Sequence, residues 1–181
     1  DKGIKTRLDI HNILFNIYKS NWTLGRNSIQ KIVNKNTSKD IAFINNVTLS
    51  SMRYQFHTKK ILKNYVRKKL KDHERILLTS AITQIVFLKF KPYAVVNCSV
   101  EIAKKLNIYH GLINACLKKI SNDKEKLNKT KINFDDLPLW FIKQTKNLKH
   151  NEKIKISNNV VEKPDLHLVF KNKKVLKEFE E

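Results

Sequence analysis

The chain has 181 residues, which is enough for one domain with a substantial core, or for one domain and part of a second. Its hydrophobic fraction of 41% is that of an ordinary globular protein, but its formal net charge of +21 is far outside the usual range. This charge favours a polyanionic partner such as nucleic acid over a small neutral substrate, although lysine enrichment in an AT-rich genome explains part of it.

The first half of the chain has the apolar spacing of amphipathic helices. The pattern predicts helices over Thr6–Tyr18 and Ser28–Val33, followed by a long periodic region over Ser38–Leu70 that breaks near Gln55–Thr58. The next segment, His73–Leu88, is almost uniformly apolar after its first residues, which predicts a helix buried on most sides at the centre of a bundle.

The second half begins with a turn at Pro92, because the residue before a proline is pushed away from helical angles. Two further helices are predicted over Tyr93–Leu106 and Tyr109–Ile120. A polar, charged linker follows, and then Asp136 offers an N-cap to a helix with Pro138 in its first turn.

Near the end of the chain the period changes to two, since Leu166, Leu168 and Phe170 alternate with other residues, as in a half-buried strand. A lone strand cannot bury its face, so this tail is interpreted as the beginning of an incomplete second domain. The predicted division is a helical domain over residues 1–122, a linker over 123–136, and a connecting helix with the first strand of a second domain over 137–181.

The segment HGLINACLKKI, residues 110–120, carries an unusual glycine and asparagine within an apolar run. At about 100° per residue, Gly111, Asn114 and Lys118 project together, on a different side from the apolar residues. Either Gly111 admits another helix and Asn114 pairs inside the fold, or Asn114 and Lys118 face RNA. We favour the internal role for Asn114, and we regard Lys118 and Lys119 as the better candidates for RNA contact.

This segment resembles the signature G-x-[VI]-N-[AG]-[VC]-L-[RK] of the NusB-like helical domain, in the version found in bacterial 16S rRNA cytosine-5 methyltransferases of the RsmB/Fmu family. The likeness continues in order along the chain, with Asp40 and Arg53 in one matching stretch and Pro92 and Glu101 in another. The later segment LPLWFIKQ, which contains Trp140, is similar to a motif that follows the domain in the methyltransferases and is absent from the free-standing antitermination factor.

The resemblance implies an all-α, NusB-like bundle, followed by the start of a small α/β domain, that positions 16S rRNA for methylation. It implies binding through phosphates, by a basic N-terminal segment and further cations. The candidate RNA-binding residues are Lys2, Lys5, Arg7, Arg53, Arg67, Lys68, Lys118 and Lys119. The residues that carry the structural motifs are Asp40, Pro92, Glu101, Gly111, Asn114 and Trp140.

No catalytic or metal site is predicted. The family's methyltransferase domain needs a glycine-rich loop for S-adenosylmethionine, and this chain has only three glycines, so both cofactor and catalysis are expected elsewhere in the full-length protein. Cys98 and Cys116 are interpreted as small core residues, and the histidines lack metal-ligand spacing.

A reducing cytoplasm is the expected environment, and no apolar run is long enough for a membrane span. Two alternatives stay open. One is a free-standing antitermination factor that binds RNA together with a ribosomal protein, and the other is a helical module that binds protein.

Overall fold

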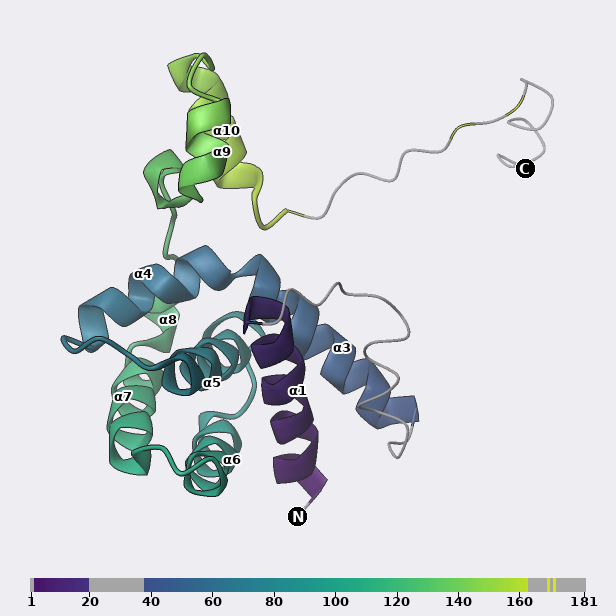
Figure 1. The fold of residues 1–181 in the computed structure, drawn as a ribbon, viewed down its shortest axis with the longest axis vertical. Coiled ribbons are helices and arrows are strands. Elements are labelled where there is room, and N and C mark those ends of the chain that lie inside the picture. The colour runs from purple at the N-terminus through teal and green to yellow at the C-terminus, as the bar shows by residue number, and fades with distance from the viewer. Residues whose placement is uncertain (1, 20–37, 163–168, 170, 172–181) are drawn as a thin grey trace.

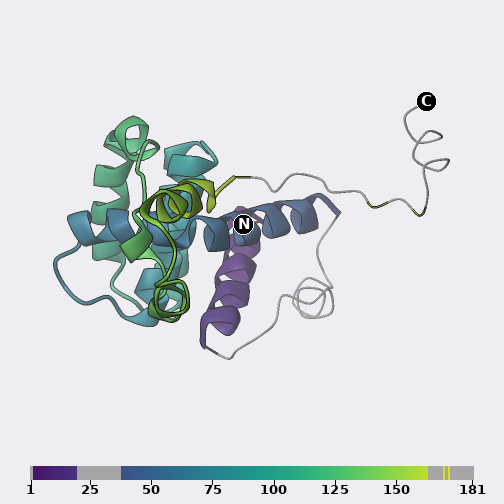
Figure 2. The same ribbon diagram turned by 90° about the horizontal axis from the view of Figure 1, so that it is seen from above.

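The computed structural model describes residues 2–19, 38–162, 169 and 171, and within these ranges every regular element is a helix (Figure 1). The predicted all-α bundle is therefore confirmed. The predicted helix over Ser28–Val33 lies outside the described residues, as does the predicted strand except for the exposed Val169. Figures 1 and 2 both place α1 and α3 on one side of the bundle and α7 on the other.

The first two described helices, α1 (Lys2–Lys19) and α3 (Ser38–Arg53), build one part of the core. Their apolar side chains recur every three or four residues, so each helix has one buried stripe. This cluster contains Ile10, Ile13, Leu14, Ile44, Val47 and Ile76. The first helix is confirmed and extends beyond its predicted start.

Helix α4 (Gln55–Tyr65) follows after a break at Tyr54, close to the predicted position. The Tyr54 ring stacks on the Phe87 ring with centroids 4.1 Å apart, which fixes the break against the centre of the bundle. The prediction that helical periodicity continues to Leu70 is wrong, because the backbone becomes extended at Val66. A loop then leads to the next helix.

Helix α5 (Asp72–Ile82) is the predicted central helix, and its residues from Ile76 onward are all buried. It does not end as a regular α-helix, because Thr83–Phe87 forms a π-helical turn, η1, that the apolar pattern did not predict. The buried Gln84 lies in this turn, where its side-chain amide donates to the carbonyl oxygen of Ser80 at 3.2 Å.

Helices α6 (Pro92–Lys105) and α7 (His110–Asn122) pack side by side and confirm the two predicted helices. Pro92 occupies the first turn of α6, where its missing N–H costs no hydrogen bond. The larger core cluster combines residues from α4, α5, α6 and α7, among them Ile82, Ile102, Ile113, Leu117 and Ile120.

Gly111 lies close to the side chain of Tyr109 at the start of α7. A Cβ atom at this position would lie 2.8 Å from the Cζ and hydroxyl oxygen of Tyr109, whose side chain is exposed. The glycine therefore leaves room for the neighbouring tyrosine ring, and the expectation that it admits another helix stays a prediction.

The predicted linker contains regular structure and core residues. A short helix, α8 (Lys124–Leu127), places Leu127 in the larger core cluster, and a 3-10 turn, η2 (Phe134–Asp136), follows. Asp136 does not cap the next helix as predicted, because its carboxylate accepts the backbone N–H of Asn133 at 2.8 Å inside that turn. The division into domains stays a prediction.

Two final helices, α9 (Leu139–Gln144) and α10 (His150–Asn159), complete the described chain. Pro138 is the N-cap residue of α9, directly before its first turn. Helix α10 was not predicted. In Figure 1, this pair lies beyond α4, on the side away from α5 and α1. Helix α4 is therefore flanked by the bundle on one side and by α9 and α10 on the other.

Candidate nucleic-acid interface

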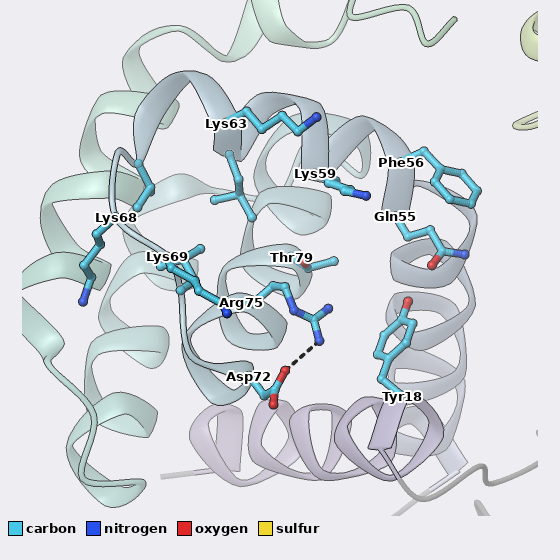
Figure 3. A pocket seen from close by; sticks show the side chains of 13 residues that line it. Tyr18, Gln55, Phe56, Lys59, Lys63, Lys68, Lys69, Asp72, Arg75 and Thr79 are labelled. Atoms are coloured by element: carbon cyan, nitrogen blue, oxygen red, sulfur yellow. Dashed lines mark hydrogen bonds and ion pairs between the residues drawn. The ribbon is translucent and has the colours of Figure 1, made fainter. Parts of the chain in front are cut away.

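A hollow of about 680 Å³ lies between α4, the loop after it, the start of α5 and the end of α1. We call it the α4–α5 groove. In Figure 3, Lys59 and Lys63 lie along α4 at the top of the view, Arg75 lies near the centre, and Gln55, Phe56 and Tyr18 lie on the right-hand side. Its cationic lining residues are Lys59, Lys63, Lys68, Lys69 and Arg75, against a single carboxylate, Asp72.

Some of these cations are already bound by protein carboxylates. Arg75 pairs with Asp72 at 3.1 Å, and Lys68 pairs with the buried Glu74 at 3.0 Å. Lys59, Lys63 and Lys69 are exposed and have no ion pair with any described residue. These three ammonium groups are available to an anionic ligand.

The groove also has apolar and aromatic walls. Leu62, Val66 and Leu70 contribute aliphatic surface, and Phe56 and Tyr18 contribute rings. The Tyr18 hydroxyl is buried without a hydrogen-bond partner among the described residues, and burial raises the pKa of this phenol. Cations beside half-buried rings and aliphatic side chains are a combination that suits single-stranded nucleic acid, because phosphates pair with the charges and bases stack on the rings.

Glu74 fixes the loop that carries Lys68 and Lys69. Its carboxylate accepts the backbone N–H of Lys71 at 2.9 Å as well as the Lys68 ammonium. Burial opposes ionisation of Glu74, but these two hydrogen bonds outweigh it, so the pKa of Glu74 is lowered and the group is ionised at neutral pH. The loop is therefore held against the first turn of α5.

Helix α4 is anchored at several points, so that Lys59 and Lys63 project from a fixed support. The Tyr65 hydroxyl donates to the Asp123 carboxylate at 2.5 Å, and the Lys60 ammonium donates to the Asp136 carboxylate at 3.1 Å. Lys59 and Lys63 are four residues apart and thus lie on the same helical face.

The predicted RNA-binding residues do not form one cluster. Lys68 lines the α4–α5 groove, and the exposed Arg67 precedes it in the same loop. Arg53 is exposed at the end of α3, and Lys5 is exposed near the start of α1. The Lys2 side chain lies outside the described part of the structure.

Lys118 lies in a separate hollow of about 420 Å³ between α6 and α7, which it shares with Asn114 and Glu101. The Glu101 carboxylate pairs with Lys104 at 2.7 Å, so this hollow lacks the excess of positive charge found at the α4–α5 groove. Asn114 is half-buried there, and Lys119 is exposed on α7. The groove, which contains more unpaired lysines, is the stronger candidate for a polyanion site.

Arg7 is bonded inside the protein. Its Nε donates to the Gln84 side-chain oxygen at 2.8 Å, its Nη1 donates to the Gly3 carbonyl oxygen at 3.3 Å, and its guanidinium lies 5.1 Å from the centroid of the Phe43 ring. These contacts join α1 to the π-helical turn and to α3. They give Arg7 a structural role, and the RNA contact proposed for it stays a prediction.

Arg7→Met is therefore expected to lower the free energy of unfolding by about 1 to 2 kcal/mol, because the buried Gln84 oxygen loses its donor. The RNA affinity should stay within about twofold of the original, since a lost phosphate contact would cost about fivefold at 0.1 M salt. Urea unfolding and RNA titration measure the two effects. Arg53→Met is the matched control for stability, because Arg53 is exposed. An RNA affinity that fell while stability stayed the same would restore Arg7 to the binding surface.

The structure places two further residues of the family motifs, and both cysteines, on or between the helices. Asp40 is half-buried in the first turn of α3, and Trp140 is exposed on α9, edge-on to Phe141 at 5.7 Å. Burial raises the pKa of the Cys116 thiol to about 11, which suits a core residue. Cys98 is half-buried near Arg7 and has no base or second cysteine beside it in the described structure.

Lys59, Lys63 and Lys69 were not among the site residues predicted from the sequence. Two lysines at i and i+4 on a polar helix face are a usable signal, but the chain contains many such lysines and only the fold shows which ones border a hollow. The contact between His11 in α1 and His73 in α5, whose ring nitrogens lie 2.9 Å apart, was not predicted either.

Within the described ranges, no group of three histidine, cysteine, aspartate or glutamate side chains could hold a metal ion. None of the described helices is long and apolar enough to cross a membrane.

Comparison with protein families gives one match, in which the model of the NusB family covers residues 5–122. No curated protein matches the chain. The matched region runs from the first turns of α1 to the end of α7, and it includes the whole α4–α5 groove.

Proposed function

The chain belongs to the NusB family, and we propose that it is the RNA-binding module of a 16S rRNA cytosine-5 methyltransferase of the RsmB/Fmu kind. The family implies RNA binding, and the observation that supports the site is the α4–α5 groove with its three unpaired lysines and aromatic end. Phosphates would pair with Lys59, Lys63 and Lys69, while bases would stack at Phe56. As an rRNA-binding protein it would act in the cytoplasm.

Helix α9 supports the methyltransferase over the free-standing antitermination factor. It belongs to the LPLWFIKQ segment, outside the matched region, and it exposes 74% of Leu139 and 62% of Trp140. Large apolar side chains held in solvent on one short helix are typical of a surface that another domain covers.

S-adenosylmethionine does not fit the residues of this chain. The three glycines, Gly3, Gly25 and Gly111, are far apart in sequence and cannot form the glycine-rich loop that cradles this cofactor. We therefore assign no step of methyl transfer to these residues, whose proposed task is to bind and position the RNA.

The proposal predicts salt-dependent binding of 16S rRNA fragments. With at least three phosphate contacts to single-stranded RNA, the logarithm of the association constant should fall with the logarithm of salt concentration with a slope of about −2 or steeper. Fluorescence anisotropy with labelled rRNA fragments between about 50 and 200 mM salt measures this slope. Binding that hardly weakens over this range would exclude the phosphate contacts. A large gain in RNA affinity on adding a ribosomal protein would favour the antitermination factor.

A further inference from the structure

The α4–α5 groove shares lining residues with a second hollow, which in turn shares one residue with a third. A second hollow of about 350 Å³ lies on the other side of α4, and both share Phe56, Lys59 and Lys63. A third hollow of about 520 Å³ lies between residues 131–135, α9 and α10, and it shares Asp135 with the second. We call the three together the basic track.

The third hollow is strongly basic. Lys131, Lys146, Lys153 and His150 line it, and Asp135 is its one carboxylate. The Lys153 ammonium is already held, since it lies 5.4 Å from the centroid of the Phe134 ring. Lys131 and Lys146 are exposed and their ammonium groups have no ion pair with a described residue.

The part of the track beyond residue 122 is fastened to the bundle. Asp136 binds the Lys60 ammonium at 3.1 Å, and the neighbouring Ile132 and Leu137 are buried. Burial disfavours the charged form of Asp136, but the Asn133 backbone N–H and Lys60 more than compensate, so the pKa of Asp136 is lowered and the ion pair persists at neutral pH. The third hollow thus has a defined place beside α4.

We propose that a single strand of RNA follows the basic track from the α4–α5 groove, across α4, into the hollow between α9 and α10. Segment 123–159, which lies outside the family match, is then part of the RNA-binding surface as well as a connection to the next domain. The inference rests on the proposed RNA binding and extends it to a second set of residues. Unpaired lysines on both sides of α4, joined by the half-buried Phe56, suit a flexible strand whose phosphates and bases alternate along the protein.

The variant K131Q/K146Q tests this extension in the full chain. At 0.1 M salt it should bind a long single strand about 25-fold more weakly, because each lost phosphate contact costs about fivefold. The slope of the logarithm of its association constant against the logarithm of salt concentration should be shallower by about 1.4. The ratio of the two proteins' RNA affinities should therefore shrink about sevenfold between about 50 and 200 mM salt. The control K91Q/K105Q removes the same charge from exposed lysines that line none of the described hollows.

A series of mixed-sequence single-stranded RNAs from about 4 to about 16 nucleotides, the range of known site sizes, gives a second measurement. The affinity of the original protein should increase with RNA length over a longer range than the affinity of K131Q/K146Q does. The shortest RNAs should bind both proteins equally. Circular dichroism checks that the variant is folded, which is expected because both lysines are exposed.

The two proposals fail in different ways. An identical length dependence and salt slope for K131Q/K146Q and the original protein would overturn the extended track and leave the groove intact. Absence of binding to RNA of every length would overturn RNA binding itself, and with it the track. An equal loss in K91Q/K105Q would show that only overall charge matters and would also reject the track.

Discussion

Replacing Lys59, Lys63 and Lys69 together by glutamine is expected to weaken single-stranded RNA binding by about 100-fold at 0.1 M salt. Each lysine neutralises one phosphate and releases condensed counterions, an effect of about fivefold per contact at this salt concentration. All three lysines are exposed at the α4–α5 groove and form no ion pair with a described residue, so their replacement breaks no internal ion pair. Anisotropy titration measures the affinity, and the salt slope should become shallower by about 2.

The matched control for this variant changes Lys39, Lys91 and Lys105 to glutamine. These lysines are also exposed and line none of the described hollows, and their replacement removes the same charge. Their loss should change affinity only through the long-range field of the protein, by less than about tenfold. Equal weakening by both triple variants would contradict a localised site at the groove.

Acidification is expected to destabilise the protein through His11 before its carboxylates titrate. His11 is only 1% exposed, and its pKa is lowered to about 4, chiefly by burial and further by the neighbouring His73. In the unfolded chain His11 is therefore protonated below about pH 6.5, whereas in the folded protein it stays neutral down to about pH 4. This stability is complete above pH 6.5 and declines as the pH falls toward about 4, by about 3 kcal/mol in all.

Urea unfolding at intervals between pH 7 and pH 5 tests this expectation, and about 2 kcal/mol should be lost in that range. His11→Phe is the informative variant, because it removes the titrating group and keeps a ring next to Phe15 and His73. The burial of His57 also lowers its pKa, so a smaller dependence should persist in the variant. Parallel pH profiles for the original protein and His11→Phe would rule out His11 as the source.

Much of the fold could be predicted from the sequence because the helices are strongly periodic. The apolar residues of α1 recur at helical spacing and those of α5 are nearly continuous, so the sequence itself indicates which faces of these helices pack in the core. The predicted helix boundaries were wrong where contacts between distant residues override the local helical periodicity. Helix α4 ends at Tyr65 because the loop after it is held by Glu74, and no periodicity signals such a contact.

The candidate site was much harder to predict than the fold. Lysine is so common in this chain that composition cannot rank one lysine above another, and the ranking comes from hollows and ion pairs. Arg7 was placed among the phosphate contacts because it lies in the basic N-terminal segment, whereas the fold uses its planar group to join Gln84 and Phe43.

The position of Leu127 has a consequence for synthesis of the chain. This residue belongs to the main core cluster although it lies beyond the last helix of the family match. On the ribosome, α1 emerges first but its partners in α5 and α6 come far later in sequence, and the core is complete only when residue 127 has left the exit tunnel. We therefore expect the nascent bundle to stay open, with its apolar faces accessible to chaperones, until translation has passed the family domain.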